Sequence, residues 1–460
     1  MLFTVGGIVT LGGCLDRSGT DDESDDETLR TTDPREVTVG FAEGTSREIT
    51  DEFAVDVLAE YDFGAVTIEV DANERDALAE HDAVTYVEEN HPVAAIDDEL
   101  LVEYTVGFDG RSGYDRVTDV AVGEVRELNH LDAVTTTIRR REAEELEGRS
   151  DVEYVTPNSV LSVPHGDSAV SINAGALAAI GRSNDDELPT GDGVRVAVLD
   201  TGVSPDHPDL GSNLDAGTAF VNGTIEAGPD ATADDYGDLG NGTRLATSIA
   251  ADGSGAVDGV TPDATVVPIK VADAAGVGRP VGIAAGIEHA VHSRCDVVLL
   301  GFTLDEGTDV VADALSYAAS ADVSLVAGVG DRGPRSEPTF PAAHPDVIGV
   351  GALASPPDPH EVPGPSDGVA AFSARGDHVD LLAPGERVPQ ATRDGGVVRM
   401  SDTNTAAALV AGAIASVRST GATAEEGREA LVGTARDIGV DDDTQGAGLI
   451  ALDAALELAG

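Results

Sequence analysis

Near-continuous apolar runs alternate with amphipathic segments over the larger, C-terminal part of the chain. Strands that are apolar throughout are typical of sheets covered on both faces. Between the runs, Ile283, Ile287 and Val291 fall on one face of a helix. The apolar runs stand at 194–200, 264–271, 296–302, 323–330 and 346–353. This pattern predicts an α/β domain over 190–460, with a mostly parallel central sheet between two layers of helices.

Two shorter regions that precede this domain repeat each other. The segment "REVTVGF" at 35–41 recurs as "VEYTVGF" at 102–108, and Tyr86 corresponds to Tyr154, with a period of about 67 residues. Alternating apolar positions flank short polar and helical stretches, so each copy is predicted to run strand, helix, strand, helix, strand. We therefore expect two small α+β modules, module 1 at 35–97 and module 2 at 101–163.

The charge of the chain limits what it can bind. Asp and Glu number 85 against 27 Lys and Arg, a net charge of −58, while 41% of the residues are hydrophobic. The acidic residues lie between apolar runs, so a core can still form, and molar salt would screen their mutual repulsion. We expect a protein of an extreme halophile. Repulsion excludes nucleic acid as a partner.

The first 34 residues indicate export and anchoring. Residues 1–14 form a short apolar run that ends in Leu-Gly-Gly-Cys, which is typical of a signal peptide with a lipidated cysteine, here Cys14. Residues 15–34 have the composition of an acidic disordered linker. We expect an extracellular protein anchored to the cell membrane through Cys14. The second cysteine, Cys295, is predicted to pack as a small apolar side chain.

Polar groups follow several of the predicted strands, where ligands gather in open α/β sheets. Asp200 ends one strand, Asn241 stands between two glycines at the start of a helix, and Asp331 follows another strand. A helix that begins near residue 402 has good capping residues and an Ala-rich body. The start of such a helix can stabilise an anion.

Ordered segments of the larger domain resemble the subtilisin-like serine proteases, or subtilases, and in particular the haloarchaeal halolysins. The matching segments include "VAVLDTGVSPDHPDL" around Asp200, "FPAAHPDVIGVGAL" and "FSARGDHVDLLAPGERV", and the similarity covers about 191–455. The resemblance implies a three-layer subtilisin-like fold and a secreted endopeptidase with an Asp, His and Ser triad. The two modules fit the position of the family's propeptide domain.

The chain departs from the family where the chemistry takes place. The resemblance places Asp200 at the triad aspartate, and it places Asn241 and Asn404 where the family has the triad histidine and serine. Asp331 replaces the asparagine that binds the oxyanion, and Arg244 replaces a second histidine. Gly301, Phe302 and Thr303 replace the substrate-binding Ser-Leu-Gly. An amide cannot accept a proton near neutral pH, and it is a very poor nucleophile. A carboxylate at the oxyanion position opposes the charge of the transition state. These replacements predict a pseudoprotease.

Nearby groups offer no obvious rescue. Ser401 precedes the helix and is expected to point elsewhere, Thr403 and Thr405 are each rotated by about 100° from Asn404, and His207 is expected on the surface. Two alternatives stay open. One is an active endopeptidase with an unrecognised arrangement, and the other is a structural surface lipoprotein with a decayed cleft.

The remaining expectations concern ligands and processing. A peptide or protein ligand and the chain's own modules in cis are the expected partners, with no cofactor. Structural calcium is possible in acidic loops such as 234–238, but no site can be assigned. Two glycosylation sequons occur; Asn222 is expected to be exposed, and Asn241 recessed. We expect no self-cleavage near 162–171.

Overall fold

The computed structural model describes residues 35–42, 53–94, 101–122, 125–128, 133–157, 171–182, 188–220, 226–227, 240–273, 276–355 and 362–459. Several sequence predictions lie outside these residues. They concern the leader 1–14 with Cys14, the linker 15–34, Asn222, the acidic loop 234–238 and most of the processing region 162–171. Within the described ranges, no helix combines the length and the apolar character that crossing a bilayer requires.

An eight-stranded sheet forms the centre of the larger domain. Neighbouring strands are parallel, except that β12 runs antiparallel beside β11 at one edge. In spatial order the strands are β12 Glu226–Ala227, β11 Thr218–Ala219, β13 Thr265–Lys270, β10 Arg195–Asp200, β15 Val297–Leu300, β16 Ser324–Gly328, β17 Val347–Leu353 and β18 Leu381–Pro384. The predicted mostly parallel sheet and the α/β fold class are confirmed.

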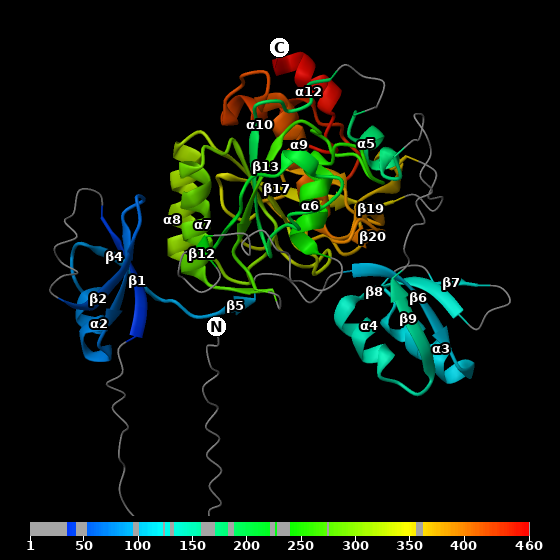
Figure 1. Cartoon of the computed structure of the whole chain (residues 1–460), viewed down its shortest axis with the longest axis horizontal. Coiled ribbons are helices and arrows are strands. Elements are labelled where there is room, and N and C mark those ends of the chain that lie inside the picture. The colour runs from blue at the N-terminus through cyan, green and yellow to red at the C-terminus, as the bar shows by residue number, and fades with distance from the viewer. Residues whose placement is uncertain are drawn as a thin grey trace, which may run out of the picture.

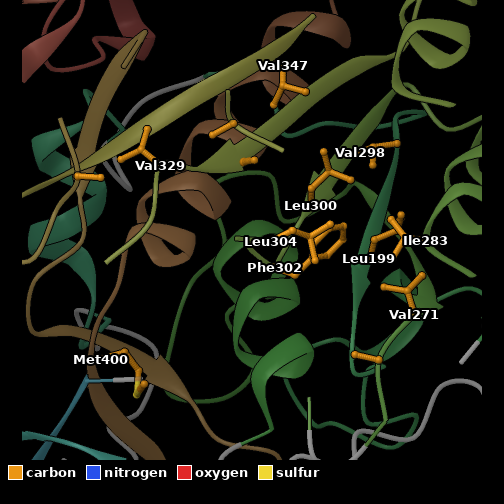
Figure 2. Packing of buried hydrophobic residues seen from close by; sticks show 14 of the residues in the cluster. Leu199, Val271, Ile283, Val298, Leu300, Phe302, Leu304, Val329, Val347 and Met400 are labelled. Carbon is orange, nitrogen blue, oxygen red and sulfur yellow. The ribbon is translucent and has the colours of Figure 1, made fainter. Parts of the chain in front are cut away.

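Helices cover both faces of this sheet, which explains why consecutive positions in the middle of its long strands are apolar. In β10, Ala197 and Leu199 face the cluster that contains α7 and α8, whereas Val196 and Val198 face the cluster that contains α6 and α9. Figure 1 shows these helices on the two sides of the sheet, and Figure 2 shows part of the first cluster. These helices are α6 Asn241–Ala250, α7 Pro280–His292, α8 Asp309–Ser320 and α9 Thr403–Arg418. The remaining helices of the domain are α5 Ala174–Ala179, α10 Ala424–Thr434, α11 Asp442–Gln445 and α12 Leu452–Ala459.

Module 1 contains a four-stranded antiparallel sheet in the order β2-β3-β1-β4. Its elements are β1 Arg35–Phe41, β2 Ala54–Glu60, β3 Ala65–Val70, α2 Ala72–Ala79 and β4 Val84–Glu89. The sequence predicted three strands with a helix between the first two; β2 is a fourth strand in that stretch, of which residues 43–52 lie outside the described ranges. Since β2 pairs with β3 from Ala54↔Val70 to Glu60↔Val66, it satisfies backbone groups that would otherwise leave β3 as an open edge.

Module 2 repeats this plan and joins a hairpin of the larger domain. Its elements are β6 Leu101–Phe108, α3 Gly110–Val120, β7 Arg126–Glu127, β8 Ala133–Arg139, α4 Arg140–Glu147 and β9 Val152–Pro157. The hairpin consists of β19 Val388–Ala391 and β20 Val397–Ser401. The first residues of β6 pair with the end of β20, Leu101 with Ser401 and Val102 with Met400, so one sheet continues from the hairpin into the module.

Module 1 lies against α7 and α8 on another side of the larger domain (Figure 1). The chain that leaves module 1 forms β5 Val93–Ala94, which pairs antiparallel with β14 Val277–Gly278 just before α7. Module 1 therefore attaches through its sheet face and its tail, whereas module 2 attaches through the end of one strand.

Candidate functional site

The residues singled out by the sequence meet beyond the carboxyl ends of β10 and β15. Asp200 is the last residue of β10, and Asn241 is the first residue of α6. The amide Nδ2 of Asn241 donates a hydrogen bond of 2.7 Å to Oδ2 of Asp200. Asn404, in the first turn of α9, donates from Nδ2 to the carbonyl oxygen of Gly301 at 3.3 Å. The two predicted asparagines thus lie on neighbouring parts of one site.

The turn before α6 brings Asn241 onto Asp200. Gly240 adopts a left-handed conformation with φ of 65°, which a residue with a side chain rarely tolerates. A Cβ atom at Gly242 would lie only 2.0 Å from the carbonyl oxygen of Gly202. Both glycines are therefore required for the close approach of the two segments, as the sequence indicated for this turn.

Asp200 is fully buried and holds its hydrogen-bond partners in fixed positions. Its Oδ1 accepts from the backbone N–H of Thr201 at 2.6 Å and from the Thr201 hydroxyl at 2.9 Å. Its Oδ2 accepts from Asn241. The carboxylate therefore orients an amide at the position to which the sequence resemblance assigns an imidazole.

Arg244 continues this network on the other side of Asn241. Its guanidinium is completely buried and donates to Oδ1 of Asn241 and to Oε1 of Gln390. It also lies 3.8 Å from Oδ2 of Asp402. The side-chain amide of Gln390 in turn donates to Ser248 at 2.8 Å. Asn241 thus uses its amide nitrogen toward a carboxylate and its amide oxygen toward a guanidinium, which fixes the orientation of the amide.

The sequence alone missed this role of Arg244. Its only signal was a single arginine in a helix of small residues, "NGTRLATSIA". A charged side chain is almost never fully buried unless it is paired. Gln390 gave no signal, because it lies in β19, 146 residues further along the chain.

The start of α9 is occupied by carboxylates. Asp402 caps the helix by accepting from the backbone N–H of Thr405. The half-buried Asp331 accepts from the backbone N–H of Thr403 through Oδ1 at 2.8 Å. Negative charge is stabilised at a helix N-terminus, and here the protein itself supplies that charge. The N–H groups that could hold an external anion are therefore partly used.

Asn404 is less tightly held than Asn241. It is half-buried, and among the described residues its amide nitrogen donates only the long hydrogen bond to Gly301, while its Oδ1 is buried without a hydrogen-bond partner. A Cβ atom at Gly328 would lie 2.8 Å from this oxygen, so the amide packs closely against the backbone of β16.

The three residues that the sequence predicted at a substrate-binding position, Gly301, Phe302 and Thr303, have different environments. Gly301 is buried, and a Cβ atom there would lie 2.4 Å from Oδ2 of Asp200. The side chain of Phe302 is 1% exposed and packs in the core beside Leu199 and Leu300 (Figure 2). Thr303 is half-buried. The carbonyl of Gly301 is thus the part of this segment that contacts Asn404.

His207 corrects one expectation. It was expected on the surface, but it is 3% exposed. Its Nδ1 accepts from the backbone N–H of Asp209 at 3.2 Å, so Nε2 carries the proton and faces the carbonyl oxygen of Thr392 at 2.9 Å. The ring is buried because both of its nitrogens are paired with backbone groups, and this pairing occupies the lone pair that a general base needs.

Other nearby nucleophiles are also engaged. The Ser401 hydroxyl accepts from the backbone N–H of Arg387 at 2.9 Å, and the Thr403 hydroxyl accepts from that of Gly330 at 3.0 Å. Thr405 differs, because its hydroxyl has no hydrogen-bond partner among the described residues, but the side chain is fully buried and closed to a substrate. Cys295 is buried as predicted, and burial raises the pKa of its thiol to about 12. Asn241 is recessed, as expected for an unused sequon.

A possible metal-ligating group lies away from this site. Within the described residues, Asp62, Glu288 and His292 form the group of three whose ligand atoms lie within 4.8 Å of one another. They join module 1 to α7. A cavity of about 530 Å³ lies between module 1 and the loop at 304–308, and none of these three residues lines it.

The comparisons with known proteins agree with this fold. Residues 191–448 match Peptidase_S8, the subtilase family. The chain is 31% identical over 304 residues to subtilisin E of Bacillus subtilis strain 168, which covers 64% of this chain and 72% of that protein. It is 32% identical over 263 residues to a subtilisin of Bacillus pumilus, covering 56% and 85% of the two chains. An intracellular serine protease of Paenibacillus polymyxa is 32% identical over 233 residues, covering 50% and 67%. This chain belongs to the subtilase family.

Proposed function

We propose that this subtilase homologue is catalytically inactive and acts at the cell surface by binding a peptide or by regulating a partner. The observation that carries the proposal is the buried chain of contacts from Asp200 through Asn241 to Arg244. A general base needs a lone pair that can take up a proton near neutral pH. The amide of Asn241 has no such group, and its oxygen already accepts from a guanidinium.

The surroundings of Asn404 support the same proposal. Asn404 has no hydroxyl to attack a carbonyl carbon. Asp331 holds a carboxylate at the start of α9, where the family places an oxyanion donor. A negative charge there raises the energy of a tetrahedral intermediate instead of lowering it. The base, the nucleophile and the oxyanion donor are therefore all replaced by groups that oppose catalysis.

Under this proposal the two modules are partners of the larger domain within the same chain and are never released from it. Module 1 pairs through β5 with β14, and module 2 pairs through Leu101 with Ser401, three residues before Asn404. Without self-cleavage, both modules stay covalently attached and remain on the segments that surround the site.

The location is a proposal that rests on the sequence. Lipidated Cys14 would hold the chain at the outer face of the membrane, and the linker 15–34 would separate it from the surface. The net charge of −58 suits the high salt of a halolysin-like homologue.

Hydrolysis of a peptide ester in molar salt tests the proposal. The parent chain and Asp200→Ala are expected to release product at the same rate as buffer alone, because neither has a general base at position 241 or a hydroxyl nucleophile at position 404. Turnover by the parent that disappears in Asp200→Ala would show that an active endopeptidase arrangement exists, and would overturn the proposal.

Restoring the family residues by mutation tests whether Arg244 suppresses hydrolysis. The triple variant Asn241→His, Asn404→Ser and Asp331→Asn restores the family residues but leaves a buried guanidinium beside the new imidazole. A neighbouring positive charge lowers the pKa of a histidine and opposes formation of the imidazolium. We expect ester hydrolysis to be higher when Arg244→His is added. Equal activity with and without this fourth change would mean that Arg244 does not suppress the site.

A further inference from the structure

Two arginines of the β19–β20 hairpin line a cavity of about 70 Å³ in the larger domain. Arg387 stands directly before β19, and Arg399 lies in β20. The chain as a whole has 85 acidic residues against 27 basic ones. Among the described residues that line this cavity, however, the two arginines are the only charged side chains. The charge of the cavity is therefore opposite to that of the protein.

Both arginines lie close to one carboxylate of module 2. Glu103 is 5% exposed. Its Oε1 lies 3.5 Å from Nε of Arg387, and its Oε2 lies 4.0 Å from Nη1 of Arg399. The pairing of Val102 with Met400 explains this position, because it sets the next residues of β6 and β20 side by side. Both distances are longer than a hydrogen bond, so Glu103 offsets charge without satisfying the N–H donors of the two arginines.

The N–H donors of the two side chains have no acceptor in the part of the chain that the structure describes. Neither guanidinium donates a hydrogen bond there, and Nε of Arg387 is buried without a partner. The side chain of Arg387 is 15% exposed and that of Arg399 is 22% exposed, so water reaches only a small part of either group. A buried charged donor without an acceptor is destabilising. The arrangement therefore points to an acceptor from outside the chain.

The charges around Arg387 agree with this reading. Burial lowers the pKa of its guanidinium, and the positive charges of Arg126 and Arg399 lower it further. Glu103 opposes this lowering, and Glu386 opposes it most weakly. An arginine stays charged in a protein despite such a shift. A bound anion would compensate the charge that these carboxylates compensate only in part.

We propose that the cavity between α5 and the β19–β20 hairpin binds one small tetrahedral dianion, sulfate or inorganic phosphate, through Arg387 and Arg399. A guanidinium group matches the oxygens of such an anion and binds them through two parallel hydrogen bonds. The volume of about 70 Å³ is several times what one water molecule needs. It is well below the roughly 300 Å³ or more of pockets for larger organic ligands. Figure 1 shows the hairpin between α5 and module 2.

Glu103 is the internal competitor of this anion. Its carboxylate attracts the same two guanidinium groups from module 2, and it repels a dianion that lies near them. Loss of the Glu103 charge is therefore expected to tighten anion binding, whereas loss of either arginine weakens it. The site includes neither Asn241 nor Asn404, so the proposal stands or fails separately from catalytic inactivity.

Equilibrium dialysis of the full chain against radiolabelled sulfate tests the proposal. Molar potassium chloride is present throughout, because it screens long-range attraction and leaves only direct contacts to hold the probe. We expect saturable binding of one sulfate per chain, which inorganic phosphate displaces. Arg387→Gln and Arg399→Gln should each weaken binding about tenfold or more. Glu103→Gln should tighten it about threefold.

Two further variants separate the site from general effects of charge and folding. Arg111→Gln, at an arginine of module 2 whose side chain is 91% exposed, is the matched control and should leave binding unchanged. Denaturant titration shows whether each variant is folded. Ser355→Phe narrows the cavity and keeps both guanidinium groups, so it tests the same site if an arginine variant does not fold, and it should abolish binding.

Three outcomes would overturn the proposal. The first is the absence of saturable sulfate binding by the parent chain. The second is binding that remains as tight in folded Arg387→Gln and Arg399→Gln, or in Ser355→Phe, as in the parent. The third is an equal loss in Arg111→Gln and Arg387→Gln, which would show that sulfate responds to the net charge of the chain and not to this cavity.

Discussion

Asn241 and Asn404 carry the same side chain but stand in different surroundings. Asn241 is 3% exposed and bonds at one end to the carboxylate of Asp200 and at the other to the guanidinium of Arg244. Asn404 is half-buried, has a single long contact to Gly301, and leaves its oxygen without a hydrogen-bond partner among the described residues. Asn241 is therefore held by buried hydrogen bonds that contribute to the stability of the domain, whereas Asn404 contributes little to that stability.

On the proposed assignment of Asn241 and Asn404 to the triad histidine and serine, this difference indicates which of the two residues is harder to restore. At Asn404 a serine needs only space, which a half-buried position provides. At Asn241 a histidine needs the removal of a buried charge that also contacts Gln390 and Asp402. A serine at 404 therefore restores nothing unless the network around Arg244 is rebuilt at the same time.

The largest expected effect comes from removing the charge that supports Asn241. Arg244→Leu leaves the carboxylate of Asp402 and the oxygen of Asn241 buried without their partner, and we expect a loss of about 3 to 5 kcal/mol in the free energy of unfolding. Denaturant titration in high salt measures it. Arg111→Leu, at an arginine whose side chain is 91% exposed, is the matched control and should change the free energy by less than about 0.5 kcal/mol. An Arg244→Leu effect as small as the control would mean that the network contributes nothing.

The second effect compares the two asparagines directly. Asn241→Leu removes a donor to Asp200 and an acceptor for Arg244, so we expect a loss of about 2 to 3 kcal/mol. Asn404→Leu removes one long hydrogen bond, and we expect less than about 1 kcal/mol. Both are measured by the same titration. Equal losses at the two positions, or a larger one at 404, would refute the contrast between them.

The smallest expected effect is a pH dependence of the free energy of unfolding, which arises from histidines outside the site. Burial lowers the pKa of His289 on α7 and that of His344 near α8. The unfolded chain therefore takes up protons first, as pH falls below about 6.5, and stability falls with decreasing pH from that value down to the folded pKa values. His289→Gln and His344→Gln should each reduce this slope between pH 7.5 and 5.5, whereas Asn241→Leu and Asn404→Leu should leave it unchanged. A slope altered by the asparagine variants would reveal a titrating group within the site.

Local patterns were sufficient to predict the core of the larger domain. Strands buried on both faces are apolar throughout, so β10, β13, β15, β16 and β17 stood out in the sequence within one or two residues of their ends. Family segments and glycine spacing placed Asp200 and Asn241 side by side. The strand β2 was missed, because it is an edge strand whose pairing partner, and not its own pattern, determines its structure.

Tertiary contacts account for what the sequence could not predict at the site. The partner of Arg244 in β19 and the burial of His207 against Thr392 both join segments more than 140 residues apart. A sequence shows that a charged residue lies in an apolar helix, but the group that pairs with it depends on the folded arrangement. The two modules have similar hydrophobic patterns but attach to the larger domain in different ways. Their attachment therefore also depends on tertiary contacts that the sequence pattern of each module does not show.

Intact-mass measurement of the full chain tests catalytic inactivity most directly. The chain is purified in molar salt, incubated, and compared with Asp200→Ala. We predict that neither chain is cut in the region 162–171, so both modules remain attached to the larger domain. A fragment that begins in this region in the parent and is absent from Asp200→Ala would contradict the inactivity of the site.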